Sequence, residues 1–318
     1  EDYPMCTGMR FNDAEGNMFF GRNLDWTFDY GERVLVVPRG FKPASPFGAT
    51  AECSHALIGM GLAEQGQPML FDAGNDAGLA VAGLNFPGYA RYESAPQEGK
   101  TNVSAWEFPL WVCANFESVD QVVDALQTTA IVDEPIASQW PSALLHWIVA
   151  DRARSVVVEY TDTGMQVFDN PVDVLANQPG YSWHAENLRN YLNVSNAWGG
   201  EGPFGRPLTP FGAGAAQRGL PGDYTSPSRF VRAAYVNANY PQKEREASNV
   251  SRMFHSLSQV AMVEGSAMAR DGKTEKTLYT GCFSSATRTY YFNTYEDVSI
   301  RSYCLDEYPQ TGDAVIEA

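Results

Sequence analysis

Two short stretches, MCTG at residues 5–8 and GRNLDW at residues 21–26, decide how we expect this chain to fold. They place a cysteine near the start and an arginine and an aspartate within one hexapeptide. The sequence before the hexapeptide is apolar, and its Gly-Arg-Asn is turn-prone. This pattern predicts a β-hairpin in which Arg22 and Asp25 lie beside Cys6. An arginine near a thiol favours the thiolate, and an aspartate can orient a nearby amine or thiol.

The thiol also needs a base, and no histidine precedes His55. A chain that began at Cys6 would supply one, because an α-amine with a pKa of about 7.7–8.0 can take the thiol proton near neutral pH. The thiol and the amine of one residue would then act as nucleophile and base. The peptide bond from Met5 removes this basicity. We therefore expect residues 1–5 to be a precursor or tag segment whose removal activates the protein.

Length and composition favour one large domain. The chain has 318 residues, is 44% hydrophobic and carries a formal net charge of −16. No linker or solenoid repeat divides it, so we expect a single domain over residues 6–318. No apolar run of about 18 residues predicts a transmembrane helix, and the acidity argues against nucleic acid or anionic membranes as partners. With no secretion signal visible, we expect a cytoplasmic protein.

The cysteines stand at positions 6, 53, 113, 282 and 304, without CxxC spacing or a histidine-rich pattern. A zinc site is therefore not expected, and neither is any other metal. Apart from Cys6, we interpret the cysteines as small buried hydrophobic residues with free thiols.

Apolar runs between turn residues predict strands in three groups, at 33–38, 56–62, 69–73 and 79–83, at 144–150, 155–160, 165–168 and 172–176, and at 277–283, 289–294 and 298–304. Helices are predicted at 119–128 with Ser118 as N-cap, at 183–191, at 226–240 with Ser226 as N-cap, and at 244–263. The order indicates an α+β fold, and a four-layer αββα sandwich of two antiparallel sheets fits it. The Gly/Pro-rich segment 193–223 is expected to be functional or an oligomer contact, and the acidic tail from residue 306 to be loose.

Seven blocks in order resemble the choloylglycine hydrolases: MCTG at 5–8, GRNLDW at 21–26, GLNFPGY at 83–89, LLHW at 144–147, LANQP at 175–179, PGDYTSPSRF at 221–230 and YYFNTY at 290–295. The resemblance covers residues 5 to about 308. Bile salt hydrolase is the nearest branch, and penicillin V acylase is the sister branch.

This resemblance implies an N-terminal-nucleophile hydrolase fold and a mature chain that starts at the cysteine. The thiol would attack an amide carbonyl and release glycine or taurine from a conjugated bile salt, with no cofactor. By position, the resemblance implies a nucleophile, an arginine beside it, a carboxylate for its amine, two oxyanion-hole asparagines and a second arginine, which are Cys6, Arg22, Asp25, Asn85, Asn177 and Arg229.

The resemblance also bears on the substrate and on assembly. Asn85 is typical of the bile salt branch, where the penicillin branch tends to have a tyrosine. Family loops that line an apolar pocket, able to seat a steroid, correspond to Leu24, Trp26, Phe71, Ile136 and Trp140. Segment 193–223 resembles the protruding loop through which family members form tetramers, so we expect a homotetramer.

Plainer interpretations stand beside these. Cys6 can be a structural thiol, Arg22 and Asp25 a salt bridge under the sheet, and Arg229 a solvated surface charge. The two asparagines can be ordinary turn residues, and the two tryptophans core aromatics. His146, on an apolar strand, is interpreted as a satisfied core histidine. Alternative functions are penicillin V or N-acyl lactone acylase, and a catalytically silent binder of steroid amphiphiles in the unprocessed form.

Overall fold

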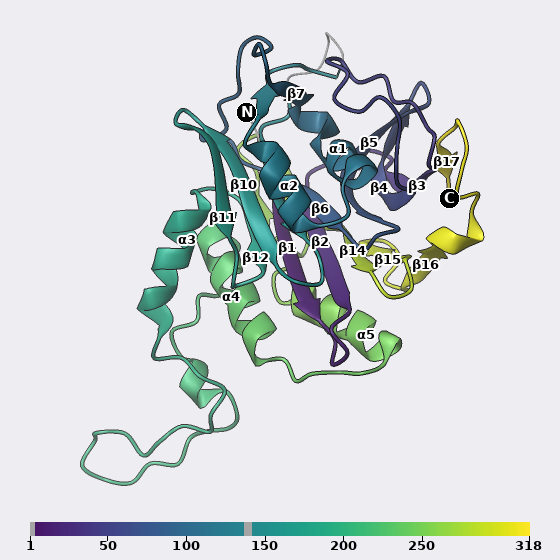
Figure 1. The fold of residues 1–318 in the computed structure, drawn as a ribbon. Coiled ribbons are helices and arrows are strands. Elements are labelled where there is room, and N and C mark those ends of the chain that lie inside the picture. The colour runs from purple at the N-terminus through teal and green to yellow at the C-terminus, as the bar shows by residue number, and fades with distance from the viewer. Residues whose placement is uncertain (1–3, 137–141) are drawn as a thin grey trace.

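The computed structural model describes residues 4–136 and 142–318, and two antiparallel sheets form its centre (Figure 1). The first sheet contains the Cys6 strand and has the order β12-β1-β2-β14-β15-β16, with β13 attached to β14. Its strands are β1 (Met5–Asn12), β2 (Met18–Trp26), β12 (Val174–Leu175), β13 (Ala267–Met268), β14 (Thr274–Ser284), β15 (Thr289–Thr294) and β16 (Arg301–Cys304).

The second sheet has the order β11-β10-β9-β6-β5-β4-β3-β17. Its strands are β3 (Arg33–Val37), β4 (Leu57–Glu64), β5 (Gln67–Asn75), β6 (Ala80–Asn85), β9 (Leu145–Ala150), β10 (Ser155–Thr161), β11 (Gly164–Asp169) and β17 (Ile316–Glu317). A separate parallel pair joins β7 (Thr101–Ser104) to β8 (Thr129–Val132).

Helices cover the outer face of each sheet, so the four-layer αββα prediction is confirmed (Figure 1). On the second sheet lie α1 (Phe108–Asn115) and α2 (Val119–Leu126), and on the first lie α4 (Ser226–Asn239) and α5 (Glu246–Ser258). The shorter α3 (Tyr181–Asn187) precedes a 3₁₀ turn and the long 193–223 segment. As predicted, Ser118 caps α2, because its hydroxyl accepts a hydrogen bond from the Gln121 N–H.

Strand β3 shows why both faces of the second sheet are apolar. Val34 and Val36 belong to the core between the two sheets, whereas Leu35 and Val37 belong to the core beneath α1 and α2. Alternation with a period of two residues therefore serves two cores at once, as expected for a sheet buried on both sides.

Several predicted details are wrong. The second predicted group of strands, at 144–176, is divided between the two sheets, since β9 pairs with β6 in the second sheet and β12 pairs with β1 in the first. Helix α5 ends at Ser258 because the following chain leaves to bond β14, where the Met262 N–H donates to the Thr277 hydroxyl. The tail is not loose, since β17 pairs with the otherwise open edge of β3.

Two further corrections concern single side chains. The residue before α4 that takes the N-cap position is Thr225, and the Ser226 hydroxyl instead accepts a hydrogen bond from the Asn177 N–H at 2.9 Å. Cys304 is half-buried rather than buried, unlike Cys53, Cys113 and Cys282.

Candidate active site

A hairpin brings the thiol and the guanidinium together as predicted, but Gly21-Arg22-Asn23 does not form its turn: these residues lie inside β2, and the turn is at residues 13–17. Cys6 pairs with Leu24, and Gly8 pairs with Arg22. Paired residues of an antiparallel sheet share a face, so Cys6 and Arg22 both point toward the second sheet. The Arg22 Nη2 lies 2.7 Å from the Cys6 Sγ, and both side chains are buried.

Arg22 is held from behind by the second sheet. Its Nη1 donates to the carbonyl of Phe71 at 3.2 Å and of Gly83 at 3.3 Å, and lies 3.8 Å from the Asp72 carboxylate. Asp72 in turn accepts hydrogen bonds from the Tyr279 and Tyr290 hydroxyls. This network was not predicted, because Asp72 and the two tyrosines come from strands far apart in the chain.

Burial raises the pKa of the Cys6 thiol, and the Arg22 charge opposes this rise. The nearby Asp25 carboxylate raises the thiol pKa further, whereas a hydrogen bond from the Asn85 backbone N–H lowers it. Because the net direction is upward from a value above neutrality, the thiol keeps its proton at neutral pH. A nucleophilic role for this sulfur would therefore require a base that removes its proton.

Asp25 lies on the opposite face of the same sheet, beside α4. It is a register partner of Met5, and its Oδ1 accepts a hydrogen bond from the Thr277 hydroxyl at 2.6 Å. Its Oδ2 is buried with no hydrogen-bond partner among the residues that the structure describes. Burial raises the pKa of Asp25 to about 6, although the Arg229 charge lowers it. Arg22 and Asp25 do not form a direct salt bridge with each other. The Arg22 guanidinium contacts the Cys6 thiol, whereas Asp25 lies beside Met5 at the start of β1.

Asn177 and Arg229 hold the backbone of the cysteine. The Cys6 N–H donates to the Asn177 Oδ1 at 2.9 Å, and the Arg229 Nη2 donates to the same oxygen at 2.6 Å. The Arg229 Nη1 donates to the Cys6 carbonyl and to the Thr7 hydroxyl. Arg229 is fully buried, so its interpretation as a solvated surface charge is wrong.

The two asparagines differ in what their amides can still bind. The Asn177 Nδ2 donates to the Asn85 carbonyl at 2.8 Å, and its backbone N–H is bound by Ser226. The Asn85 Nδ2, in contrast, is buried and has no partner within the described chain. Asn85 therefore has a buried amide donor without a recorded partner, whereas the Asn177 side chain binds Cys6, Arg229 and Asn85.

Two of the predicted pocket residues, Leu24 and Trp26, lie on β2, and Phe71 lies on β5. Leu24 and Trp26 are buried, whereas Phe71 and Ile136 are half-buried. Trp140 lies outside the described residues. A row of ring contacts runs from Trp26 through Phe28 and Tyr30 to Phe71, with ring centroids 4.8–5.7 Å apart. This row was not predicted. The signal in the sequence is the FDY triplet at 28–30, one residue after the end of GRNLDW.

Metal ligands do not cluster in the described chain. Over residues 4–136 and 142–318, no group of three or more His, Cys, Asp or Glu side chains has an arrangement that could hold a metal ion. Within the same ranges, no helix has the length and apolarity needed to cross a membrane.

Two antiparallel sheets between helical layers, with a buried cysteine near the start of an inner strand, form the fold of the N-terminal-nucleophile hydrolases. Residues 6–311 match the model of the linear amide C–N hydrolases, choloylglycine hydrolase family. The chain belongs to this family, and it is therefore an amidase.

Individual proteins and solved structures similar to this chain support the same family. The "Bile salt hydrolase/transferase" of Bifidobacterium longum subsp. longum is 52% identical, over 98% of this chain and 99% of that protein. The structure of a conjugated bile acid hydrolase from Clostridium perfringens superposes with a TM-score of 0.92 at 36% identity, over 98% of this chain and 96% of that one. Penicillin V acylase from Agrobacterium tumefaciens gives a TM-score of 0.76 at 18% identity, over 98% of this chain and 90% of that one, so it shares the fold.

The Clostridium perfringens enzyme is represented by two altered forms. In one an arginine is replaced by leucine, and in the other a cysteine is replaced by alanine. Along the sequence, the cysteine and the arginine replaced in those forms are as many residues apart as Cys6 and Arg22 are in this chain.

Proposed function

We propose that this protein hydrolyses glycine- or taurine-conjugated bile salts to free bile acid and amino acid, with Cys6 as the nucleophile. The observation that carries the proposal is the buried Cys6 sulfur, held 2.7 Å from the Arg22 guanidinium in a chain of this family. The full-length identity of 52% to a bile salt hydrolase/transferase supports the substrate class.

The proposal includes removal of residues 1–5. In the structure the Cys6 nitrogen is an amide, and it already donates to the Asn177 Oδ1. Loss of Met5 would turn it into an amine next to the buried Asp25 Oδ2, an acceptor that otherwise lacks a partner among the described residues. The family match begins at Cys6, which supports this position as the mature start.

The reaction then proceeds through a thioester. The α-amine takes the thiol proton, and the sulfur attacks the amide carbonyl while the Asn85 Nδ2 donates to the oxyanion. The protonated amine returns its proton to the departing nitrogen of glycine or taurine as the C–N bond breaks. Water, deprotonated by the same amine, attacks the thioester and releases the bile acid and the Cys6 thiol. Arg22 stabilises the thiolate at both ends of the cycle.

Substrate comparison tests the proposal. Protein that begins at Cys6 is incubated separately with glycocholate, taurocholate, phenoxymethylpenicillin and an N-acyl homoserine lactone, and the released amines are quantified. Release of glycine or taurine as the fastest reaction is the expected result. Preferred cleavage of penicillin or lactone would transfer the chain to the acylase alternative. Binding of bile salt without turnover of any substrate would favour the silent binder.

Removing the Asn85 amide should slow the chemistry while leaving binding intact. We expect Asn85→Ala to lower kcat by about 100–1,000-fold with little change in KM, because the amide is needed only when the oxyanion forms. Steady-state kinetics on a conjugated bile salt measure this. Asn190→Ala, at an exposed position on the surface, is the control. An Asn85→Ala enzyme with normal kcat would remove Asn85 from the oxyanion hole.

Asp25 should set the acid limit of activity. It must be ionised to hold an ammonium group, so activity is expected to fall as the pH drops through its pKa, which is about 6 in this chain. The free ammonium of the mature chain favours the carboxylate, which places the midpoint at or below about pH 6. Asp25→Asn should cost about 10- to 100-fold at neutral pH and abolish this acid limb.

The same pKa predicts how Asp25 affects stability. Its folded-state pKa is raised from 3.8 to about 6, so its contribution to stability is fully present below pH 3.8 and is lost as the pH rises through about 6. Asp25→Asn is therefore expected to leave the free energy of unfolding at pH 7 unchanged or higher, as measured by urea denaturation. A large loss of stability would show that the carboxylate acts mainly in the fold.

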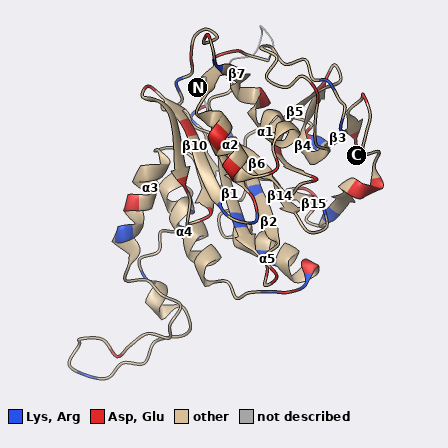
Figure 2. Ribbon diagram, in the orientation of Figure 1, with Lys and Arg blue, Asp and Glu red and all other residues tan. Residues whose placement is uncertain are grey.

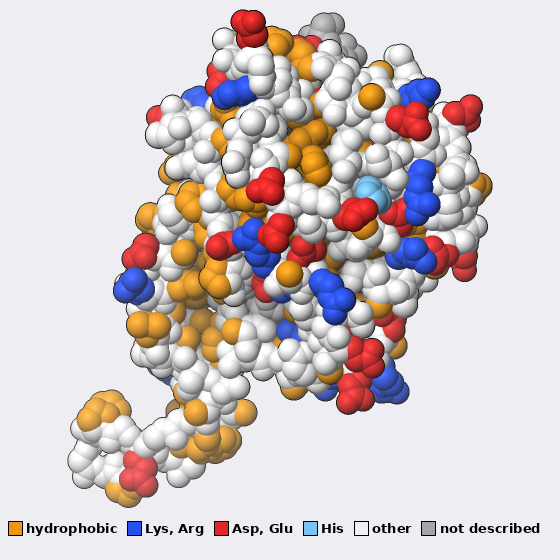
Figure 3. All heavy atoms as spheres, viewed as in Figure 1, with side chains coloured by type: hydrophobic (Ala, Val, Ile, Leu, Met, Phe, Trp, Pro, Cys, Tyr) orange, Lys and Arg blue, Asp and Glu red, His pale blue; other side chains and the backbone are white. Residues whose placement is uncertain are grey.

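The proposal also includes a homotetramer in the cytoplasm. Segment 193–223 extends far from the body as a long arm with few charges (Figures 1 and 2). Apolar side chains gather along it (Figure 3), and those of Trp198, Phe204 and Phe211 are 56%, 73% and 112% exposed. Exposed aromatics of this kind indicate a protein contact. The free cysteines of the described chain fit a reducing compartment.

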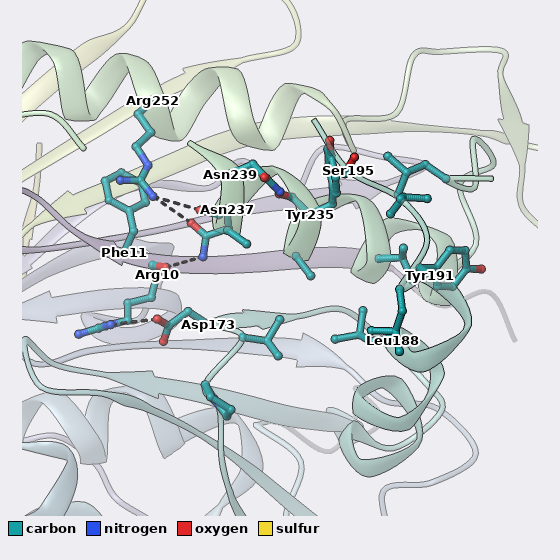
Figure 4. Close-up of a pocket in the computed structure, with 18 of the residues that line it drawn as sticks. Arg10, Phe11, Asp173, Leu188, Tyr191, Ser195, Tyr235, Asn237, Asn239 and Arg252 are labelled. Carbon is teal, nitrogen blue, oxygen red and sulfur yellow. Dashed lines mark hydrogen bonds and ion pairs between the residues drawn. The ribbon is translucent and has the colours of Figure 1, made fainter. Parts of the chain in front are cut away.

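A second copy of the chain can be received beside the base of the arm. A cavity of about 730 Å³ lies there between α4, β1 and the turn after α3 (Figure 4). Leu188 and Tyr191 line one side of it, and Tyr235 and Asn237 line the other. At one end Arg252 lies over the Phe11 ring at 3.7 Å and donates to Asn237.

Light scattering tests the assembly. The triple variant Trp198→Ser, Phe204→Ser, Phe211→Ser is expected to shift a tetramer to smaller species. Val298→Ser, at a 79% exposed position on the body, is the matched control. A tetramer that survives the triple change would show that the arm does not hold the copies together.

A further inference from the structure

Two buried histidines bind consecutive carbonyl groups of the segment that carries Asn177. On β9, the His146 Nε2 lies 2.8 Å from the Ala176 carbonyl, and on α3 the His184 Nε2 lies 3.0 Å from the Asn177 carbonyl. Both side chains are fully buried. Because a carbonyl oxygen only accepts, each Nε2 must carry the proton.

The other ring nitrogen has a different environment in each histidine. The His184 Nδ1 is buried and has no partner in the described part of the chain, and burial lowers the pKa of His184 to about 4. His184 is therefore neutral, with its proton on Nε2. The His146 Nδ1 lies 3.2 Å from the Glu159 carboxylate, which also accepts the Tyr181 N–H. His146 thus faces an acceptor at both nitrogens.

With these bonds, every polar atom of Asn177 has a partner. Its carbonyl is held by His184, its N–H by Ser226, its Oδ1 by Cys6 and Arg229, and its Nδ2 by Asn85. The side chain makes three hydrogen bonds, two at Oδ1 and one at Nδ2, and another rotamer would break them. The position of the Cys6 nitrogen therefore depends on the backbone that the histidines hold.

Each histidine also stacks on the neighbour of another site residue. The His146 ring stacks on Phe86, the residue that follows Asn85, with centroids 4.1 Å apart and an interplanar angle of 8°. The His184 ring stacks on Phe230, the residue that follows Arg229, with centroids 4.7 Å apart and an angle of 18°. The two rings thus connect the Asn177 segment to the segments of the proposed oxyanion donor and of the second arginine.

We propose that His184 and His146 are positioning residues that fix Asn177, and through it the nitrogen of Cys6, relative to Asn85 and Arg229. Neither histidine touches the sulfur, so neither exchanges a proton with the reacting atoms. The inference rests on the proposed function, because it assigns the histidines to the geometry of that reaction. It explains why an apolar strand and a short helix each bury a histidine.

Two substitutions at His184 separate its donor from its ring. His184→Phe keeps the ring against Phe230 but removes the N–H, whereas His184→Gln keeps a donor near Nε2 and removes the ring. We expect His184→Phe to lower kcat by about 10- to 100-fold with KM within about twofold, as for a small misplacement of catalytic groups. His184→Gln should recover to within about fivefold of the parent. His255→Phe, on the exposed face of α5, is the control.

Thermal melting of each variant accompanies the kinetics. Phe and Gln variants that melt together but differ in kcat support the proposal, as does the corresponding His146 pair. Full kcat in folded His184→Phe would overturn it, and so would a folded Gln variant as slow as the Phe variant. Parent protein starting at Cys6 is assayed in parallel. If the parent cleaves no conjugate, the proposed function itself has failed. The histidines are then tested independently by the pH profile of Cys6 alkylation by iodoacetamide. His184→Phe should shift this profile, and His184→Gln should not.

Discussion

Cys6→Ala is expected to lower the release of glycine or taurine on the order of 10⁴-fold or more, which leaves no activity detectable above background. The reason is that Cys6 supplies the sulfur that Arg22 binds, whereas the Asp72 carboxylate behind Arg22 is already bound by two tyrosine hydroxyls. Amino-acid release from a conjugated bile salt, measured with protein lacking residues 1–5, gives the rate. Bile salt binding should persist, because the pocket residues are unchanged.

The controls for this change are built into the chain. Cys113→Ala alters an equally buried thiol on α1, away from the site, and should retain the parental rate. Cys6→Ser keeps a hydroxyl of similar size and tests the need for sulfur rather than for volume. Labelling by iodoacetamide is read in a Cys304→Ser background, because Cys304 is the half-exposed thiol. Substantial turnover by Cys6→Ala would disprove the proposed nucleophile.

Exposing the Cys6 nitrogen should have the second largest effect. A chain made with a cleavable leader that ends directly before Cys6 is expected to be inactive, and the same sample should gain about 1,000-fold or more when the leader is cut. An amide nitrogen cannot accept the thiol proton, whereas an α-amine can. The burial-raised pKa of the thiol makes this base necessary. Intact mass and activity are followed together during cleavage.

A matched sample separates the amine from the cut itself. Acetylating the new terminus after cleavage restores an amide without restoring residues 1–5, and activity is expected to disappear again. A leader-bearing chain that turns over at the rate of the cleaved one would show that the base lies elsewhere. In that case the unpartnered Asp25 Oδ2 would need another explanation.

Local sequence carried the hairpin and the layer order. The apolar run of β3, the Ser118 cap of α2 and the apolar stripe of α5 are properties of short windows, and they predict these elements, although α5 ends at Ser258 rather than at residue 263. The spacing of Cys6 and Arg22 likewise predicts their approach, because a two-stranded register is local, whereas Asp25 lies on the opposite face of the sheet. The resemblance to a family added Asn85, Asn177 and Arg229, which no local pattern singles out.

Long-range pairings lay beyond the sequence. Nothing near Asp72 indicates that two tyrosines about two hundred residues away bind it. The C-terminal Ile316 joins β3 because that edge needs backbone partners, and acidity alone suggested a loose tail. His146 appeared as a core histidine, and its bond to Ala176 is visible only in three dimensions.

The opening hairpin lies in the middle of its sheet, between β12 and β14. During synthesis this hairpin therefore waits for a neighbouring strand that is made much later and ends at Ser284. A nascent chain stopped before β14 lacks the Thr277 hydroxyl that binds Asp25, so it has no finished pocket for the new amine. Synthesis itself thus delays the completion of this pocket until Thr277 has been added to the chain.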